Sequence, residues 1–240
     1  MKSLRLFFLI SVLSALFCVS CDQFENLKEY NFETVYPGRF DKITYMIGFE
    51  RVEIDLMNAG RIWAKDMNLG KAVRTVYEYD GKVFELDSLY SWVNVTGLSE
   101  KKLYRIQVYT MDDYKNKSIP FSIAVVPYTS IDRDLLVVPT PKAVMKADGT
   151  VTITWPVGIN TPMADFVELA YTYTDIDGPK TGVLTGNSPR LEMKMELGKS
   201  HTIGLTYKLR PILSGTTTRI IDTVSLYLPL VLDKDMPITP

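Results

Sequence analysis

Cysteine and histidine are scarce in this 240-residue chain, and their scarcity excludes several kinds of chemistry. The two cysteines, Cys18 and Cys21, both lie near the start, so the rest of the chain has no disulfide bond and no reactive thiol. His201 is the single histidine, which leaves no Ser-His-Asp or Cys-His catalytic set and no zinc motif. A glycine-rich phosphate loop is absent as well. The sequence therefore predicts a protein that is not an enzyme and that needs no cofactor or metal ion, with His201 in a structural role.

Positive charge and long apolar runs are also limited. The chain has 27 Lys and Arg against 28 Asp and Glu, and without residues 1–20 it has 25 against 28, a net charge of −3. Because nucleic-acid binding needs a basic face, nucleic acid is not an expected partner. The longest apolar run covers residues 6–19, which is shorter than the ~20 residues of a membrane-spanning helix.

The first residues have the layout of a bacterial lipoprotein signal. Lys2 and Arg5 form a basic start, the apolar run follows, and a small residue precedes Cys21. We predict a signal peptide over residues 1–20, lipidation of Cys21 and a polar tether over residues 21–35. Several acyl chains would hold the protein stably at the outer membrane, where we expect it to face the cell surface. A cleaved secretory signal with an incidental cysteine is the alternative, and the leaflet is left open.

From residue 36 onward the sequence has the pattern of short β-strands. Residues 52–56 alternate apolar and polar side chains with a period of two. Asp80-Gly81 is a strong hairpin signal. Residues 127–141 contain three prolines and separate two such series. The other predicted strands are 73–79, 83–86, 92–95, 103–110 and 121–126 in the first series, and 151–155, 166–174, 182–185, 191–195, 202–209 and 220–228 in the second.

This spacing of strands and turns predicts an all-β protein with two tandem β-sandwich domains of the fibronectin type III or immunoglobulin-like type. We assign residues 36–128 to the first domain, 129–141 to a linker and 142–232 to a second, more divergent domain. No helix is expected beyond a single turn at Leu135-Leu136.

One local spacing favours the fibronectin type III form. Leu98 is followed six residues later by Tyr104, a spacing that resembles the tyrosine corner of fibronectin type III domains. Ile106 then stands where an immunoglobulin domain has its second cysteine. Met195 and His201 repeat the spacing in the second half, which suggests two related domains.

As a whole, the chain resembles a family of uncharacterised surface lipoproteins of Bacteroidota-type bacteria. The resemblance rests on Tyr36-Pro37-Gly38, on Gly48-Phe49-Glu50-Arg51-Val52 and on the fibronectin-like body that follows. Genes of that family often lie among polysaccharide-utilisation genes. The resemblance therefore implies a polysaccharide, or another outer-membrane protein, as the partner.

Aromatic side chains are the candidates for contact with such a ligand. An exposed ring can stack on the C–H face of a sugar while neighbouring Asp, Asn and Arg side chains bind its hydroxyls. One candidate lies in an irregular segment that we predict to be a loop, and the others form two pairs that each share one face of a strand. Tyrosine is also common at half-buried strand positions, which is the alternative for both pairs. The candidate ligand-binding residues are Trp63, Tyr77, Tyr79, Tyr171 and Tyr173.

Three further hypotheses concern other residues. Residues 53–58 resemble the opening of the catalytic strand of laminarinase- and lichenase-like glycosidases, but the second glutamate of that strand is missing. The acidic turns at 112–113 and 175–177 leave a calcium site open, although neither has the spacing of an EF-hand. We expect Trp92 and Trp155 to lie in the core.

Together these observations predict a non-catalytic cell-surface lipoprotein. Its expected role is that of an accessory glycan-binding or protein-docking component of polysaccharide utilisation. The alternative is a structural or adhesive surface protein, which a long exposed edge strand would favour. A glycosidase is the third hypothesis.

Overall fold

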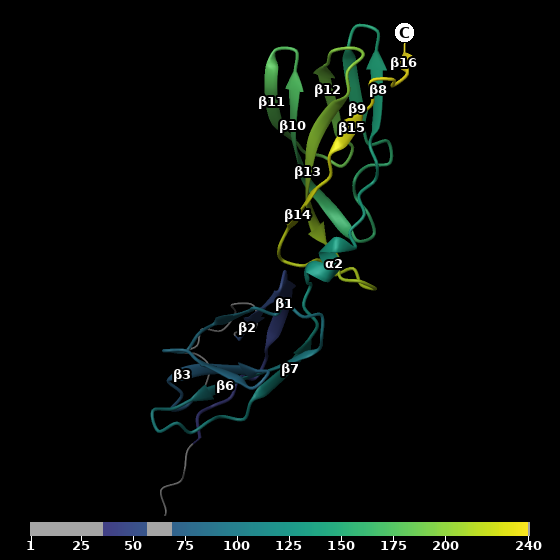
Figure 1. Cartoon of the computed structure of the whole chain (residues 1–240). Helices are drawn as coiled ribbons and strands as arrows, with labels where there is room; N and C mark the ends of the chain where they lie inside the picture. The colour runs from purple at the N-terminus through teal and green to yellow at the C-terminus, as the bar shows by residue number, and fades with distance from the viewer. Residues whose placement is uncertain (1–35, 57–68, 240) are drawn as a thin grey trace, which may run out of the picture.

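The computed structural model describes residues 36–56 and 69–239 of the chain (Figure 1). Within these residues nearly every regular element is a β-strand, and the strands form two bodies that lie end to end. A short helix, α2 (Ser130–Asp134), lies between them. The predicted all-β class is therefore confirmed. No helix of the described segments is long and apolar enough to cross a membrane.

The first body is a sandwich of two antiparallel sheets. The strand order is β1-β2-β5 in the three-stranded sheet and β4-β3-β6-β7 in the four-stranded sheet. Neighbouring strands such as β2 and β5 are not consecutive in the chain, which is typical of Greek-key sandwiches. The strands are β1 (Thr44–Gly48), β2 (Arg51–Asp55), β3 (Arg74–Tyr79), β4 (Lys82–Glu85), β5 (Trp92–Thr96), β6 (Tyr104–Met111) and β7 (Phe121–Val125).

The second body repeats this arrangement. Its sheets have the orders β12-β9-β8-β16 and β11-β10-β13-β14, with β15 also paired to β13 and β16 parallel to β8. Apart from β15 and β16, the order in both bodies is the same, which confirms the tandem fibronectin type III-like sandwiches that the sequence predicts. The strands are β8 (Lys142–Lys146), β9 (Thr150–Thr154), β10 (Ala164–Asp175), β11 (Gly178–Leu184), β12 (Arg190–Lys194), β13 (His201–Pro211), β14 (Val224–Tyr227), β15 (Leu230–Leu232) and β16 (Ile238–Thr239).

Local sequence explains one turn and one helix. Asp80 and Gly81 have φ angles of 49° and 72° between the paired residues Tyr79 and Lys82, which is the geometry of a two-residue hairpin. The expectation of no helix beyond a turn at 135–136 was wrong, because α2 forms just before that position. The backbone N–H of Thr129 donates to the Asp132 carboxylate at 3.0 Å. Thr129 and Asp132 thus form a capping box, which starts the helix directly after the strands of the first body.

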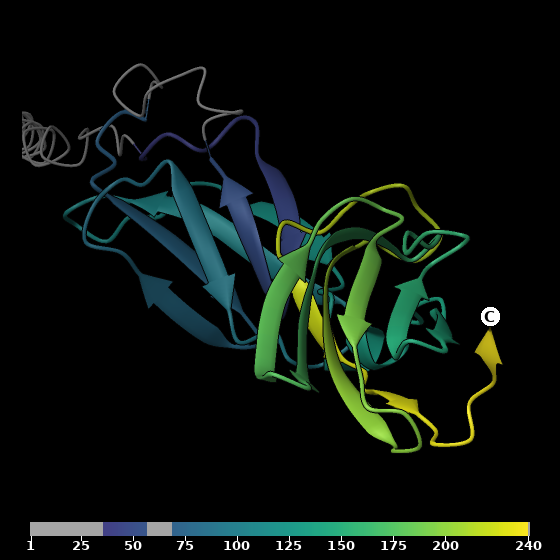
Figure 2. The ribbon, with the colours of Figure 1, turned by 90° about the horizontal axis from the view of Figure 1, so that it is seen from above.

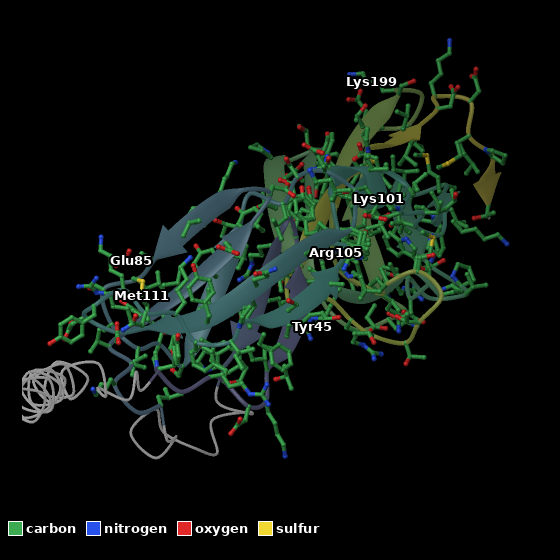
Figure 3. The ribbon with its side chains drawn as sticks, turned by 90° about the horizontal axis from the view of Figure 1, so that it is seen from below. Tyr45, Glu85, Lys101, Arg105, Met111 and Lys199 are labelled. Atoms are coloured by element: carbon green, nitrogen blue, oxygen red, sulfur yellow. The ribbon has the colours of Figure 1, made fainter. Side chains whose placement is uncertain are left out.

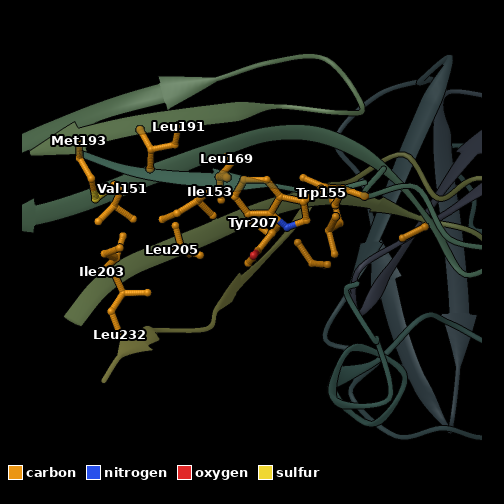
Figure 4. Packing of buried hydrophobic residues seen from close by; sticks show 14 of the residues in the cluster. Val151, Ile153, Trp155, Leu169, Leu191, Met193, Ile203, Leu205, Tyr207 and Leu232 are labelled. Atoms are coloured by element: carbon orange, nitrogen blue, oxygen red, sulfur yellow. The ribbon is translucent and has the colours of Figure 1, made fainter. Parts of the chain in front are cut away.

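Each body has its own apolar core. In the first body, Val52 and Ile54 of β2 are fully buried and pack against the inner side chains of β5 and β6. In the second, Trp155 is 1% exposed and meets Tyr207 edge to face, with ring centroids 6.3 Å apart (Figure 4). Burial of this magnitude stabilises each sandwich by the hydrophobic effect and explains how both hold together without disulfide bonds.

The two predicted corner residues occupy equivalent positions in the two bodies. Tyr104 is 3% exposed, and its hydroxyl accepts a hydrogen bond from the Glu100 backbone N–H at 3.4 Å. His201 Nε2 lies 2.8 Å from the Glu196 carbonyl oxygen and therefore donates to it. Each ring ties the start of a strand to the turn before it, which is a structural task.

The bodies meet at the turn between β1 and β2. Figures 1 and 2 both bring the end of β1 close to the segment before β14. The Ile221 N–H donates to the Ile47 carbonyl at 3.0 Å, and the Glu50 N–H donates to the Tyr128 carbonyl at 2.7 Å. Ile47 and Phe49 also pack against the core of the second body. Backbone and apolar contacts together therefore fix how the two bodies join.

Candidate functional site

The outer face of the three-stranded sheet carries the strongest candidate site. Along β2, Val52 and Ile54 point into the core, so Arg51, Glu53 and Asp55 point outward. Strand pairing extends this face into three rows, each with one residue from β1, β2 and β5. The rows are Gly48-Arg51-Thr96, Met46-Glu53-Asn94 and Thr44-Asp55-Trp92. We call these nine residues the outer face.

Trp92 is the aromatic residue of this face, and its position corrects the sequence prediction. We expected Trp92 in the core, but its side chain is 43% exposed. The reason is the phase of the strand: Val93 and Val95 are 3% and 0% exposed, so they fill the inner positions and Trp92 must point outward. An exposed indole ring beside polar side chains is thus available for contact with a ligand.

Arg51 organises the polar part of the outer face. Its Nη1 donates to the carboxylate of Glu53 and, at 3.2 Å, to Asn94 Oδ1. Its Nε and Nη2 donate to the two carboxylate oxygens of Asp222 in the second body, at 2.9 and 2.8 Å. The sequence motif around Arg51 drew attention to this residue, but nothing in the sequence pointed to its partner, which lies 171 positions further on.

The Arg51–Asp222 pair is held in its charged form. Hydrogen bonding to Asp222 raises the pKa of Arg51, and hydrogen bonding from Arg51 lowers the pKa of Asp222. The Phe49 backbone N–H adds a third hydrogen bond to Asp222, at 2.8 Å. With a carboxylate accepting three bonds, the junction fixes the guanidinium in one orientation beside the outer face.

The predicted pair Tyr77 and Tyr79 lies on the opposite side of the first body and faces inward. Tyr77 stacks on Phe84 with centroids 4.8 Å apart, and Tyr79 is 9% exposed. The Tyr79 hydroxyl donates to the Thr96 carbonyl at 3.1 Å. Burial raises the pKa of both phenols. These rings belong to the core, so they form no exposed platform.

The other predicted pair, Tyr171 and Tyr173, lies on β10 and packs partly against the second core. The two rings stack on each other with centroids 6.0 Å apart. A Cβ at Gly182 of the neighbouring strand would lie 2.3 Å from the Tyr171 hydroxyl oxygen, so that ring lies directly over the glycine. The pair is half-buried and covers the hairpin of β10 and β11.

Among the described residues, the outward face of the four-stranded sheet of the first body carries no exposed aromatic platform either. Arg105 and Met111, both labelled in Figure 3, lie near the two ends of this face on β6. Tyr109 between them is 3% exposed, because Lys117 covers it with its ammonium group 4.9 Å from the ring centroid. Side chains of the first body therefore shield the Tyr109 ring on this face from a ligand.

Several other predicted features can be located only in part. Trp63 and Cys21 lie outside the described residues. Glu53 and Asp55 do share an outer face, as the glycosidase hypothesis requires, but Glu53 is engaged by Arg51. Asp112 accepts two hydrogen bonds from Asn116 and so closes its own turn. Within residues 36–56 and 69–239, no group of three or more acidic, histidine or cysteine residues is arranged to hold a metal ion.

Comparisons with known proteins give a family for the chain and no activity. The family model DUF4998, described as a domain of unknown function, matches residues 21–196. No curated protein matches the chain.

Three solved structures illustrate what the chain is similar to. A chain of a cytokine receptor complex is 12% identical, with a TM-score of 0.28 over 82% of this chain and 98% of its own. The chicken CNTN1 FN1–FN3 domains are 8% identical, with a TM-score of 0.36 over 80% of this chain and 67% of their own. A segment of two fibronectin type III domains from chicken tenascin is 14% identical, with a TM-score of 0.27 over 80% of this chain and all of its own, 100%.

Proposed function

The chain belongs to the DUF4998 family, and we propose that it is a non-catalytic docking protein whose outer face binds a glycan at the bacterial cell surface. The observation that carries this proposal is Trp92, an exposed indole next to the row of Glu53 and Asn94 on the same face of the sheet. A flat apolar ring stacks on sugar C–H groups, and carboxylate, amide and guanidinium groups bind hydroxyls.

The geometry also favours binding over catalysis. Glu53 is tied to Arg51, and Asp55 is only 2% exposed, so the two carboxylates do not flank an open space for a scissile bond. Glycosidases need two carboxyl groups on either side of that bond, about 5 Å or more apart across it. Two residues on one strand face provide a one-sided surface instead.

Attachment through Cys21 is part of the proposal and rests on the signal-like start of the chain. A lipid anchor would raise the effective concentration of the outer face at the membrane. Weak, shallow recognition of a polymer would then be sufficient. Association with polysaccharide utilisation is carried by the resemblance described above.

The test is electrophoresis of the purified protein in native gels that contain plant, host or microbial polysaccharides. We expect one neutral or acidic glycan to retard the wild type, and Trp92→Ala to abolish the retardation. Tyr114→Ala is the matched control, because Tyr114 is 83% exposed and lies on the turn between β6 and β7, which belong to the other sheet. Equal retardation of wild type and Trp92→Ala would reject the outer face as the site, and no retardation by any glycan would reject glycan binding.

A structural or adhesive role is the second candidate, and β11 is the observation that favours it. This seven-residue strand is at the end of its sheet and pairs with β10 alone among the described strands. Val183 on it is 57% exposed. However, Pro179 and Lys180 at its start are typical of edges protected against strand addition. A peptide that adds a strand should shift the backbone amide NMR signals of β11, and unchanged signals would exclude this role.

A further inference from the structure

Glu53 and Asn94 present a hydrogen-bond acceptor and a donor side by side on the outer face. They are paired across β2 and β5, so their Cβ atoms lie about 5 Å apart. The Oε1 atom of Glu53 and the Oδ1 atom of Asn94 both accept from Arg51. Glu53 Oε2 and Asn94 Nδ2 form no hydrogen bond with another residue of the described segments. Because the Glu53 side chain is 31% exposed and Asn94 is exposed too, a ligand can reach both groups.

Arg51, by contrast, has almost no donor left for an acidic ligand. Its four hydrogen bonds to Asp222, Glu53 and Asn94 use four of the five N–H groups of the guanidinium. A carboxylate is held best by two parallel N–H bonds from one arginine, and the remaining N–H cannot supply both. Arg51, Glu53 and Asp222 together carry one positive and two negative charges, so this cluster would also repel an anion.

We propose that the outer face selects a neutral polysaccharide and binds two adjacent hydroxyls of one sugar ring, an inference that rests on the glycan-binding function proposed above. One hydroxyl donates to Glu53 Oε2, and its neighbour accepts from Asn94 Nδ2. Trp92 lies two residues before Asn94 on the same face of β5, about 7 Å along the strand. Its indole is thus in reach of the same sugar or of the next one in the polymer.

The chemistry of the two free groups also decides against a cationic amino sugar. An ammonium group has only donors, so it would satisfy Glu53 but would turn a donor toward the donating amide nitrogen of Asn94. A hydroxyl both donates and accepts, and two adjacent hydroxyls therefore satisfy the acceptor and the donor together. The ligand class that fits is a neutral sugar polymer with adjacent free hydroxyls.

The test is affinity electrophoresis of the purified protein over a range of polysaccharide concentrations, which gives a Kd for each polymer. The neutral polymers are 1,4-linked glucans, mannans and xylans and a 1,3-linked glucan, whose internal sugars lack adjacent free hydroxyls. Polygalacturonate and alginate are the acidic polymers. We expect a 1,4-linked neutral polymer to bind, with an affinity that is the same at about 0.1 and 1 M NaCl because no ion pair forms. The 1,3-linked glucan and the acidic polymers should not bind.

Two variants of almost unchanged shape test the assigned groups. Glu53→Gln replaces a charged acceptor by a neutral one, and Asn94→Asp replaces the donor by an acceptor. Each should weaken binding of the neutral polymer about tenfold, the difference of about 1.4 kcal/mol expected for one such bond. Glu85→Gln is the matched control, because Glu85 also accepts from an arginine, Arg74, but lies on β4 of the other sheet. Thermal unfolding shows whether each variant is folded.

The outcomes separate this inference from the function on which it rests. No binding by any polymer would reject glycan binding, and the inference with it. Binding of an acidic polymer that Trp92→Ala abolishes would keep the outer face as a glycan site but overturn the selection of neutral ligands. A 1,3-linked glucan bound as tightly as the 1,4-linked polymers would refute the adjacent hydroxyls. Equal affinity of the wild type, Glu53→Gln and Asn94→Asp would refute the two groups assigned to them.

Discussion

The ion pair between Arg51 and Asp222 should join the two bodies into one cooperative unit. Replacing Asp222 by Ala removes a carboxylate that accepts hydrogen bonds from Arg51 Nε, Arg51 Nη2 and the Phe49 N–H. The Arg51 and Asp222 side chains are 23% and 27% exposed, so water can replace these bonds only in part. Hydrogen bonds to charged groups contribute about 1.5–3 kcal/mol each when buried, and a partly exposed pair contributes less. We expect Asp222→Ala to lower the free energy of unfolding by about 2–3 kcal/mol.

Urea denaturation of Arg51→Ala, Asp222→Ala and the double variant measures this pair in a double-mutant cycle. The cycle removes the contribution of the Glu53 and Asn94 contacts of Arg51, which are lost in both backgrounds. We expect a coupling energy of about 2 kcal/mol and a single unfolding transition for the wild type. Lys199→Ala is the control, because the Lys199–Glu196 pair is more than half exposed and should contribute less than about 0.5 kcal/mol. Additive effects of the two substitutions would refute the reasoning.

The pH dependence gives the same pair a second signature. Because the folded pKa of Asp222 lies below its unfolded value, near 3.9, its contribution is fully present above that value. The contribution is lost as the pH falls through the folded pKa. The stability difference between wild type and Asp222→Ala should therefore be constant near pH 7 and shrink below about pH 4. A difference that stays constant down to pH 2 would contradict the assigned charge state.

Three further substitutions test other contacts. Gly48→Ala should destabilise the protein by about 2 kcal/mol, because the new Cβ would lie 2.5 Å from Asp222 Oδ2 and 2.7 Å from Arg51 Cγ. Its cost should fall only in part in the Asp222→Ala background when both are measured by urea denaturation, since the contact with Arg51 remains. Trp155→Ala should cost about 3–5 kcal/mol, since the indole is 1% exposed in the second core, and an unchanged thermal midpoint would contradict that burial. His201→Ala should cost about 1 kcal/mol through loss of the bond to the Glu196 carbonyl, whereas a cost near zero by the same assay would show that the bond is dispensable.

The sequence was sufficient for features that depend on neighbours along the chain. The alternation at 52–56 correctly gave an inner and an outer face for β2, and Asp80-Gly81 correctly located a hairpin. Both follow from period-two geometry and from the φ angles that a tight turn demands. The repeated strand series then led to two sandwiches.

Features that depend on distant residues or on strand phase were not predictable in the same way. Trp92 could be assigned to the wrong face because a tryptophan next to valines is as apolar as they are, and only their alternation decides which side is buried. Tyr77 and Tyr79 could lie on either face of their strand, because a tyrosine has an apolar ring and a polar hydroxyl and so tolerates half-burial. The short helix depends on one capping box, a signal too local to show against β-rich surroundings.

Arg51 connects the outer face to the domain junction, and this changes how the site should be understood. One guanidinium divides its donors between Asn94 on the face and Asp222 in the other body. If Asp222 is lost, the guanidinium gains freedom, and ordering it again on a ligand costs conformational entropy. Asp222→Ala should therefore weaken any ligand of the outer face severalfold, although Asp222 is not one of its nine residues. Unchanged affinity in that variant would mean that contacts from the second body do not affect ligand binding at the outer face.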